Sequence, residues 1–179
     1  MKNKSVKRQS GFTIVEVLVS SVIFSIIAMA VSSIFVQTLG LQRRGAAAQK
    51  IQDNALFVLE SMSRDIRVSD IANQESANCT ATTLTITHPD PAKGTIIYRL
   101  NGDVVEKSQN GGSYVAISGS DVSFTRFNFC ITGSLQNDNK TPRIAILSTV
   151  QNKSGREILK VNLQTTVSSR DVIDEFSFP

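Results

Sequence analysis

Residues 7–36 read KRQSGFTIVEVLVSSVIFSIIAMAVSSIFV, and the rest of the chain is interpreted outward from this stretch. A basic, hydrophilic segment ends at Gly11, and the residues from Phe12 to Val36 contain a single charged side chain, Glu16. A helix of that length spans ~37 Å, enough to cross the ~30 Å hydrocarbon core of a bilayer. The sequence therefore predicts a helix that enters a membrane and carries one carboxylate with it.

The net charge of the chain is concentrated beside this apolar run. Four basic residues precede Gly11 with no acidic residue among them, and the remaining chain has as many acidic as basic side chains. A cationic flank is typical of the cytoplasmic side of an apolar helix. We expect a single-pass protein of the cytoplasmic (inner) membrane with an extracytoplasmic C-terminal domain. A nucleic-acid partner stays uncertain, because the overall composition shows no basic excess in that domain, although a few residues can form a basic patch locally.

The apolar run has three interpretations at this point. It can be a plain signal anchor, left uncleaved. It can be an ordinary secretory signal, because Ala28-Met29-Ala30 has the small-x-small form that leader peptidase cuts. In the third interpretation the cut falls before the apolar run, after Gly11, and Phe12 becomes the new N-terminus.

The stretch GFTIVEVLVSSVIF, which begins at Gly11, resembles the prepilin signal of type IV pilins and of the pseudopilins of type II secretion. The resemblance rests on a short basic leader, Gly11, Phe12, and Glu16 four residues later, in register with a long apolar helix. It implies that a prepilin peptidase cuts the Gly11–Phe12 bond at the cytoplasmic face and that the new Phe12 amine is methylated.

Glu16 is the charged exception in the apolar run, and a carboxylate at membrane depth is costly unless a cation accompanies it. Cleavage would create a cationic amine at Phe12, with Glu16 at i+4 on the same helix face. The two groups can neutralise each other within one subunit, or Glu16 of an incoming subunit can pair with the Phe12 amine of its neighbour. Our hypothesis is that Glu16 guides subunit assembly. The alternative is a tolerated acid near the membrane interface.

Beyond Val36 the sequence becomes polar but keeps a helical period. Apolar residues at steps of three and four form one stripe over 48–66, with charged residues opposite, and no proline interrupts. We expect one helix from about Thr13 to about Ser69. Phe57 breaks the stripe and projects from its polar side, where it either packs beneath a local loop or contacts a neighbouring subunit.

From Thr80 onward the apolar period becomes two, which predicts strands. Asn101-Gly102 between two such runs predicts a hairpin with a type I′ turn, and a phase slip near Thr125 predicts a bulge. The fold class is therefore α+β: a long N-terminal helix, its first half transmembrane, packs by its second half on an antiparallel sheet. This layout resembles the pilin fold. The expected segments are a leader (1–11), a transmembrane assembly helix (12–36) and an extracytoplasmic pilin-like domain (37–179), helical to about residue 70.

Cys79 and Cys130 lie outside the apolar run. They can pair as a disulfide if this region is extracytoplasmic, or remain buried thiols. The sequence contains no GxSxG, no phosphate-binding glycine loop and no HExxH, so we expect no enzyme, cofactor or metal site. The oxygen-rich QNDNK at 136–140 lacks the spacing of an EF-hand.

Two further phrases, LESMSRDIRVSDI (59–71) and LKVNLQTTVSSRDV (159–172), resemble the J-type pseudopilins and the W-type minor pilins. That resemblance implies a low-abundance subunit that starts or caps a filament on the bacterial cell surface. It implies as partners the prepilin peptidase, other pilin or pseudopilin subunits and, indirectly, the inner-membrane platform and assembly ATPase. Apart from this resemblance, the sequence predicts that Arg64, Asp65 and Arg67 lie at a solvent-exposed helix end. The competing function is a secreted or membrane-anchored soluble binding domain with an ordinary signal sequence.

Overall fold

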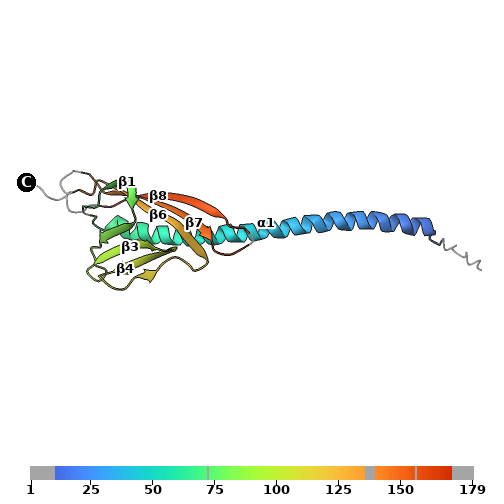
Figure 1. The fold of residues 1–179 in the computed structure, drawn as a ribbon, viewed down its shortest axis with the longest axis horizontal. Helices are drawn as coiled ribbons and strands as arrows, with labels where there is room; N and C mark the ends of the chain where they lie inside the picture. The colour runs from blue at the N-terminus through green and yellow to red at the C-terminus, as the bar shows by residue number, and fades with distance from the viewer. Residues whose placement is uncertain (1–10, 72, 136–139, 156, 171–179) are drawn as a thin grey trace, which may run out of the picture. The chain divides into compact units, whose positions relative to one another are not determined.

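The computed structural model describes residues 11–71, 73–135, 140–155 and 157–170 (Figure 1). The chain divides into two units, Met1–Arg43 and Arg44–Pro179. Helix α1 (Ile14–Val68) contributes its N-terminal part to the first unit and its C-terminal part to the second. The predicted helix from about Thr13 to about Ser69 is confirmed.

The C-terminal part of α1 is amphipathic. From Ile51 onward its buried positions recur at steps of three and four, which place them on one face of the helix. The apolar stripe begins at Ile51 rather than at Ala48, which is exposed. The buried positions are Ile51, Ala55, Val58, Leu59, Met62, Asp65 and Ile66.

The strands form two antiparallel sheets, each of four strands. Sheet A has the order β2-β3-β4-β5, and sheet B has the order β1-β6-β7-β8. The expectation of one antiparallel sheet was therefore incomplete, because side-chain alternation predicts strands but not which strands pair. In the described residues the strands are β1 (Ser76–Ala81), β2 (Thr83–Thr87), β3 (Thr95–Asn101), β4 (Val104–Gln109), β5 (Val115–Ala116), β6 (Val122–Thr132), β7 (Arg143–Asn152) and β8 (Lys160–Ser168).

One hydrophobic core joins the helix to both sheets, as the one-sided patterns predicted. Met62 and Ile66 of α1 belong to the same buried cluster as Ile86 and Tyr98 of sheet A and Ile146 of sheet B. The inward phenylalanines of β6 pack edge to face, with ring centroids 5.8 Å apart for Phe124 and Phe127 and 5.2 Å apart for Phe127 and Phe129. The helix and the sheets thus cover one another's apolar faces.

The hairpin between β3 and β4 is where we expected it, but its turn differs. The last ladder pair is Asn101–Val104, so the central residues are Gly102 and Asp103. Gly102 has φ +62°, whereas Asp103 is not at positive φ. A type I′ turn requires positive φ at both central residues, so that prediction was wrong, and glycine at the first central position is typical of type II′. The predicted bulge is confirmed: the register of β6 against β7 shifts between Phe124 and Arg126.

Candidate functional site

The first residues of α1 hold the predicted processing and assembly site. The Glu16 backbone N–H donates to Thr13 Oγ1 at 3.3 Å, and the Val17 N–H donates to the Thr13 carbonyl at 3.2 Å. Thr13 is therefore the N-cap, and Glu16 is the third helical residue. Threonine followed three residues later by glutamate is the signature of a capping box, a signal that went unused above. Glu16 thus also helps to start the helix, where an acid is stabilised by the helix dipole.

Gly11 and Phe12 precede the helix in non-helical backbone, and the Phe12 side chain is 81 % exposed. The expectation that Phe12 and Glu16 share one helix face was therefore wrong. The reason is the N-cap: once the Thr13 side chain bonds the first turn, the residue before it lies outside the helix. The bond between Gly11 and Phe12 lies in exposed, non-helical chain of the kind a peptidase can enter.

The Glu16 side chain is exposed, and no cation pairs with it among the residues that the structure describes. Several hydroxyl groups of this part of α1 are satisfied by the helix itself. Ser20 Oγ donates to the Glu16 carbonyl at 2.7 Å, and Ser32 Oγ donates to the Ala28 carbonyl at 2.7 Å. Such bonds remove the demand of these hydroxyls for water, whereas the Glu16 carboxylate is charged and needs a partner in an apolar medium.

Phe57 lies on the exposed face of α1, as predicted, with 64 % of its side chain accessible, so it is not packed beneath a local loop. Its neighbour Leu56 is also exposed. Glu60 and Arg64 on the same face form an i,i+4 ion pair at 2.9 Å. Leu56 and Phe57 therefore form a small apolar surface on a charged helix face.

Asp65 is buried, which corrects the interpretation of this helix end as solvated. Asp65 Oδ2 accepts hydrogen bonds from Tyr98 Oη and Lys107 Nζ, each at 2.6 Å, and Lys93 Nζ lies 3.9 Å from Oδ1. Arg64 and Arg67 are exposed, as expected. Helical geometry explains the difference, because Asp65 lies on the buried side with Met62 and Ile66 while the two arginines lie opposite.

The Asp65 carboxyl stays ionised at neutral pH. Burial acts to raise the pKa of Asp65, but the hydrogen bonds from Lys107 and Tyr98 and the nearby lysine charges outweigh it, so the pKa lies below its usual value. Burial, together with the bond to the Asp65 carboxylate, raises the pKa of Tyr98. Tyr98 therefore stays a neutral donor, and the group ties the end of α1 to sheet A.

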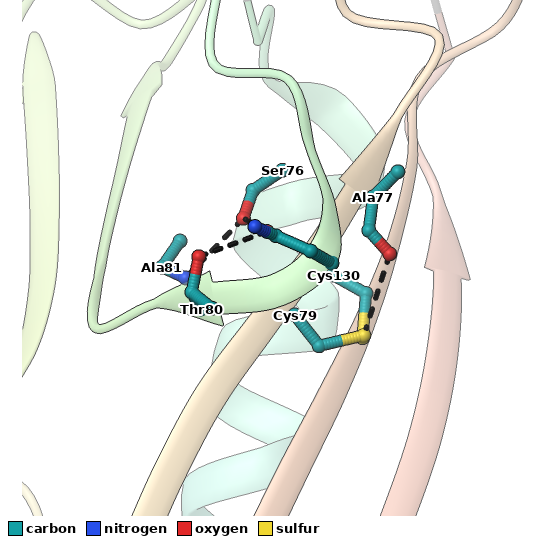
Figure 2. Close-up of a disulfide and its surroundings, with 7 residues drawn as sticks. Ser76, Ala77, Cys79, Thr80, Ala81 and Cys130 are labelled. Carbon is teal, nitrogen blue, oxygen red and sulfur yellow. Dashed lines mark hydrogen bonds between the residues drawn. A yellow bond between two sulfur atoms is a disulfide. The ribbon is translucent and has the colours of Figure 1, made fainter.

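Cys79 and Cys130 form a disulfide (Figure 2). Four residues of β1 lie between its two ladder pairs with β6, Ser76–Ile131 and Ala81–Phe129, so a short loop faces Cys130. Cys79 has φ +61°, an unusual region for a residue with a side chain. The Ala81 N–H donates to Ser76 Oγ at 3.2 Å across the base of the loop. The disulfide thus joins the poorly paired edge strand β1 to its neighbour β6 in sheet B.

In the part of the chain that the structure describes, no three His, Cys, Asp or Glu side chains lie together as a metal site would require. Residues 136–139 of the QNDNK stretch lie outside the described residues.

Comparison with known proteins identifies the N-terminal region. A family model for the prokaryotic N-terminal methylation motif matches residues 6–35. The motif fits a type IV pilin or pseudopilin subunit. No curated protein and no solved structure matches the chain. The matched segment covers Gly11, Phe12 and Glu16.

The pilin-like motif indicates a structural subunit rather than an enzyme, and it implies processing by a prepilin peptidase and assembly with other pilins. The architecture, one long N-terminal apolar helix followed by antiparallel sheets, is that of a pilin-like α+β protein. By length and composition, α1 can cross a membrane near its N-terminus, which fits a membrane-anchored pilin. The phrases that resemble J-type and W-type subunits lie outside the matched residues, and the comparisons give no evidence for either subfamily.

Proposed function

We propose that this chain is a minor pilin or pseudopilin of a type IV pilus or of a type II secretion-like filament. It is inserted in the inner membrane by residues 12–36, cleaved after Gly11 and methylated on the Phe12 amine. It then joins a filament through its N-terminal helix. The observation that carries this proposal is the methylation motif at residues 6–35, placed on a helix whose first turn holds a carboxylate with no cationic partner among the described residues.

The helix start supports an ion pair between subunits rather than within one. A Phe12 amine would lie before the N-cap, and Glu16 is engaged with the cap through its backbone N–H, while its carboxylate has no cationic partner in the part of the chain that the structure describes. The Phe12 amine of a neighbouring subunit would neutralise that carboxylate in a dry environment. A buried polar pair of this kind specifies register between helices, as polar residues do in coiled coils.

The proposed role as a minor subunit comes from the resemblance of residues 59–71 and 159–172 to subunits that start or cap filaments. The apolar pair Leu56 and Phe57 on an otherwise charged helix face supports a contact with a neighbouring globular domain in such an assembly. The platform and the assembly ATPase would act on the inserted helix without contacting this surface.

N-terminal sequencing and intact mass of the protein from its native membrane test the proposal. The expected mature chain begins at Phe12 and carries a methyl group on its amine. A chain that begins at Val31 would instead support a secreted binding domain. A fully active chain that still begins at Met1 would contradict the proposal, because no Phe12 amine would then exist.

A further inference from the structure

Sheet B has an outer face with a distinctive charge. Side chains alternate along β6, β7 and β8, and one set, including Phe127, Ile146 and Val167, enters the core. The ladder register aligns the other set across the three strands. We define the outer face of sheet B as Arg126, Asn128, Cys130, Thr132, Arg143, Ala145, Leu147, Thr149, Gln151, Lys160, Asn162, Gln164, Thr166 and Ser168.

Among these described positions, three are basic and none is acidic. Arg126, Arg143 and Lys160 are all exposed. The acidic residues that precede these strands are paired: Asp121, before β6, pairs with Lys50, and Glu157, before β8, pairs with Arg44. The outer face of sheet B therefore has a positive field that the neutral composition of the chain conceals.

The rest of this face consists mainly of amides and hydroxyls. Thr149 Oγ1 donates to Asn162 Oδ1 at 2.8 Å between β7 and β8, which orients the Asn162 side chain. Such groups donate to phosphate and sugar oxygens without reading sequence. The face carries no aromatic residue at its described positions, so it offers no platform on which unpaired bases or sugar rings could stack.

We propose that the outer face of sheet B binds the sugar–phosphate backbone of duplex DNA. Arginine is favoured for phosphate because its planar fork donates two parallel hydrogen bonds. The partner has to be an extended polyanion, since the three cations are spread over the face rather than gathered at one point. The absence of stacking residues favours a duplex over single strands and over polysaccharides. This inference does not depend on the proposed assembly role.

Sheet geometry gives the size of the site. Six residues along β7 separate Thr149, which is opposite Arg126, from Arg143, so the two arginines lie ~20 Å apart at 3.4 Å per residue. Lys160 lies two strands from Arg126 at ~12 Å. Lys160 is opposite Gln151, eight residues along β7 from Arg143, so the two most distant cations lie ~27 Å apart and span about eight base pairs. Three phosphate contacts predict that log K falls with log salt at a slope of about −2.7.

The test uses the full chain in non-ionic detergent and a fluorescein-labelled 20-base-pair DNA duplex, with binding followed by anisotropy between about 50 and 200 mM salt. The variant is the triple substitution Arg126→Ala, Arg143→Ala and Lys160→Ala. The matched control is Arg43→Ala, Arg64→Ala and Arg67→Ala, which removes the same charge from exposed positions outside this face. The four basic leader residues are common to all three proteins, so differences between them report the substituted positions.

We expect the triple variant to lose at least tenfold in affinity at low salt and to flatten the slope by about three, while each single substitution flattens it by about one. The control should bind like the wild type, and all proteins should have the same circular dichroism spectrum. Equal binding by the triple variant and the wild type would overturn the proposal. So would displacement of the duplex by single-stranded DNA or by a sulfated polysaccharide at equal charge concentration.

The sequence after Arg170, DVIDEFSFP, contains three acidic residues and supplies a second check. A variant with Asp171→Asn, Asp174→Asn and Glu175→Gln should bind the duplex no more than a few fold more tightly than the wild type. If only this variant bound the duplex, the natural ligand of the face would be the acidic C-terminal segment, and the DNA proposal would be overturned.

Discussion

Helix α1 contains two regions with opposite relations to their surroundings. Residues 14–36 are apolar on every side apart from Glu16 and the serines, and all of them are exposed. Residues 44–68 have one apolar face, and the described domain buries it. The same backbone thus serves a lipid or helix-bundle environment in one region and a protein core in the other. The pattern of side chains around the helix decides which environment each region needs.

The largest effect is expected from the two glutamates of α1. Glu16→Ala should reduce incorporation into filaments to background, because the carboxylate that pairs with a neighbour's Phe12 amine is lost. Glu60→Ala should leave incorporation unchanged, since Glu60 only meets Arg64 on an exposed face. The measurement is the fraction of each variant in sheared filaments by immunoblot. Equal incorporation of both variants would remove Glu16 from the assembly mechanism.

Asp65 is an acid that finds its partner inside its own domain, in contrast to Glu16. Lys107→Met should lower the free energy of unfolding by about 3 kcal/mol, the lower end for breaking a buried pair, because Lys93 retains part of the compensation. Lys50→Met removes a surface pair with Asp121 and should leave stability unchanged. Urea unfolding followed by circular dichroism compares the two, and equal midpoints would show that the buried pair contributes no stability.

The two methionines Met29 and Met62 report the environments directly. Met62 is fully buried, so Met62→Ala should destabilise the domain by about 2–4 kcal/mol through lost contacts and a cavity. Met29 is 68 % exposed, and Met29→Ala should leave unfolding of the domain unchanged. Chemical denaturation of both variants in detergent distinguishes the outcomes. A large loss for Met29→Ala would mean that residues 14–43 belong to the cooperative folding unit.

Acid should weaken the domain through Asp65 but not through an exposed acid of the same helix. The folded pKa of Asp65 lies below its usual 3.8, so its contribution is fully present above that pH and is lost as the pH falls through the folded value. Asp65→Asn should therefore be less stable than the wild type at neutral pH but lose less stability below pH 3.8. Asp53→Asn, on the exposed face, should follow the wild-type curve. Thermal unfolding as a function of pH tests this, and parallel curves for Asp65→Asn and the wild type would contradict it.

The smallest effect on stability is expected at Phe57. Phe57→Ser should change the free energy of unfolding by no more than ~0.5 kcal/mol, because the side chain is exposed. Leu59→Ala, two residues away at 8 % exposure, should cost ~2 kcal/mol or more. If Phe57 contacts a neighbouring subunit, its substitution should still lower filament yield. A folded Phe57→Ser variant that assembles normally would exclude that contact.

Much of the fold could be predicted because its signals are local. The length of α1, its amphipathic second part, the β3–β4 hairpin and the bulge near Thr125 follow from periods and turn residues within short windows. The Thr13–Glu16 cap is also a local signal, because threonine and glutamate three residues apart are typical of a helix start. The turn type failed because the ladder closed one residue later than the Asn-Gly pair suggested.

The features that could not be predicted depend on residues far apart in the chain. Asp65 is buried because Tyr98 and Lys107, which lie 33 and 42 residues away in sequence, converge on its carboxylate. The disulfide was left open because spacing alone does not bring two cysteines together, whereas the looped edge strand does place Cys79 against Cys130. Both features follow from strand register, which side-chain alternation does not specify between distant strands.

The sequence by itself determined that a basic leader, a Gly-Phe junction and an acid in the first helical turn begin a long apolar helix, because these are properties of neighbouring residues. Tertiary structure alone decided that the strands divide into two sheets and that Arg126, Arg143 and Lys160 share one acid-free face. The net charge is a sum over all residues and does not depend on where they lie, whereas the electrostatic field at a surface depends on which side chains the strand register aligns.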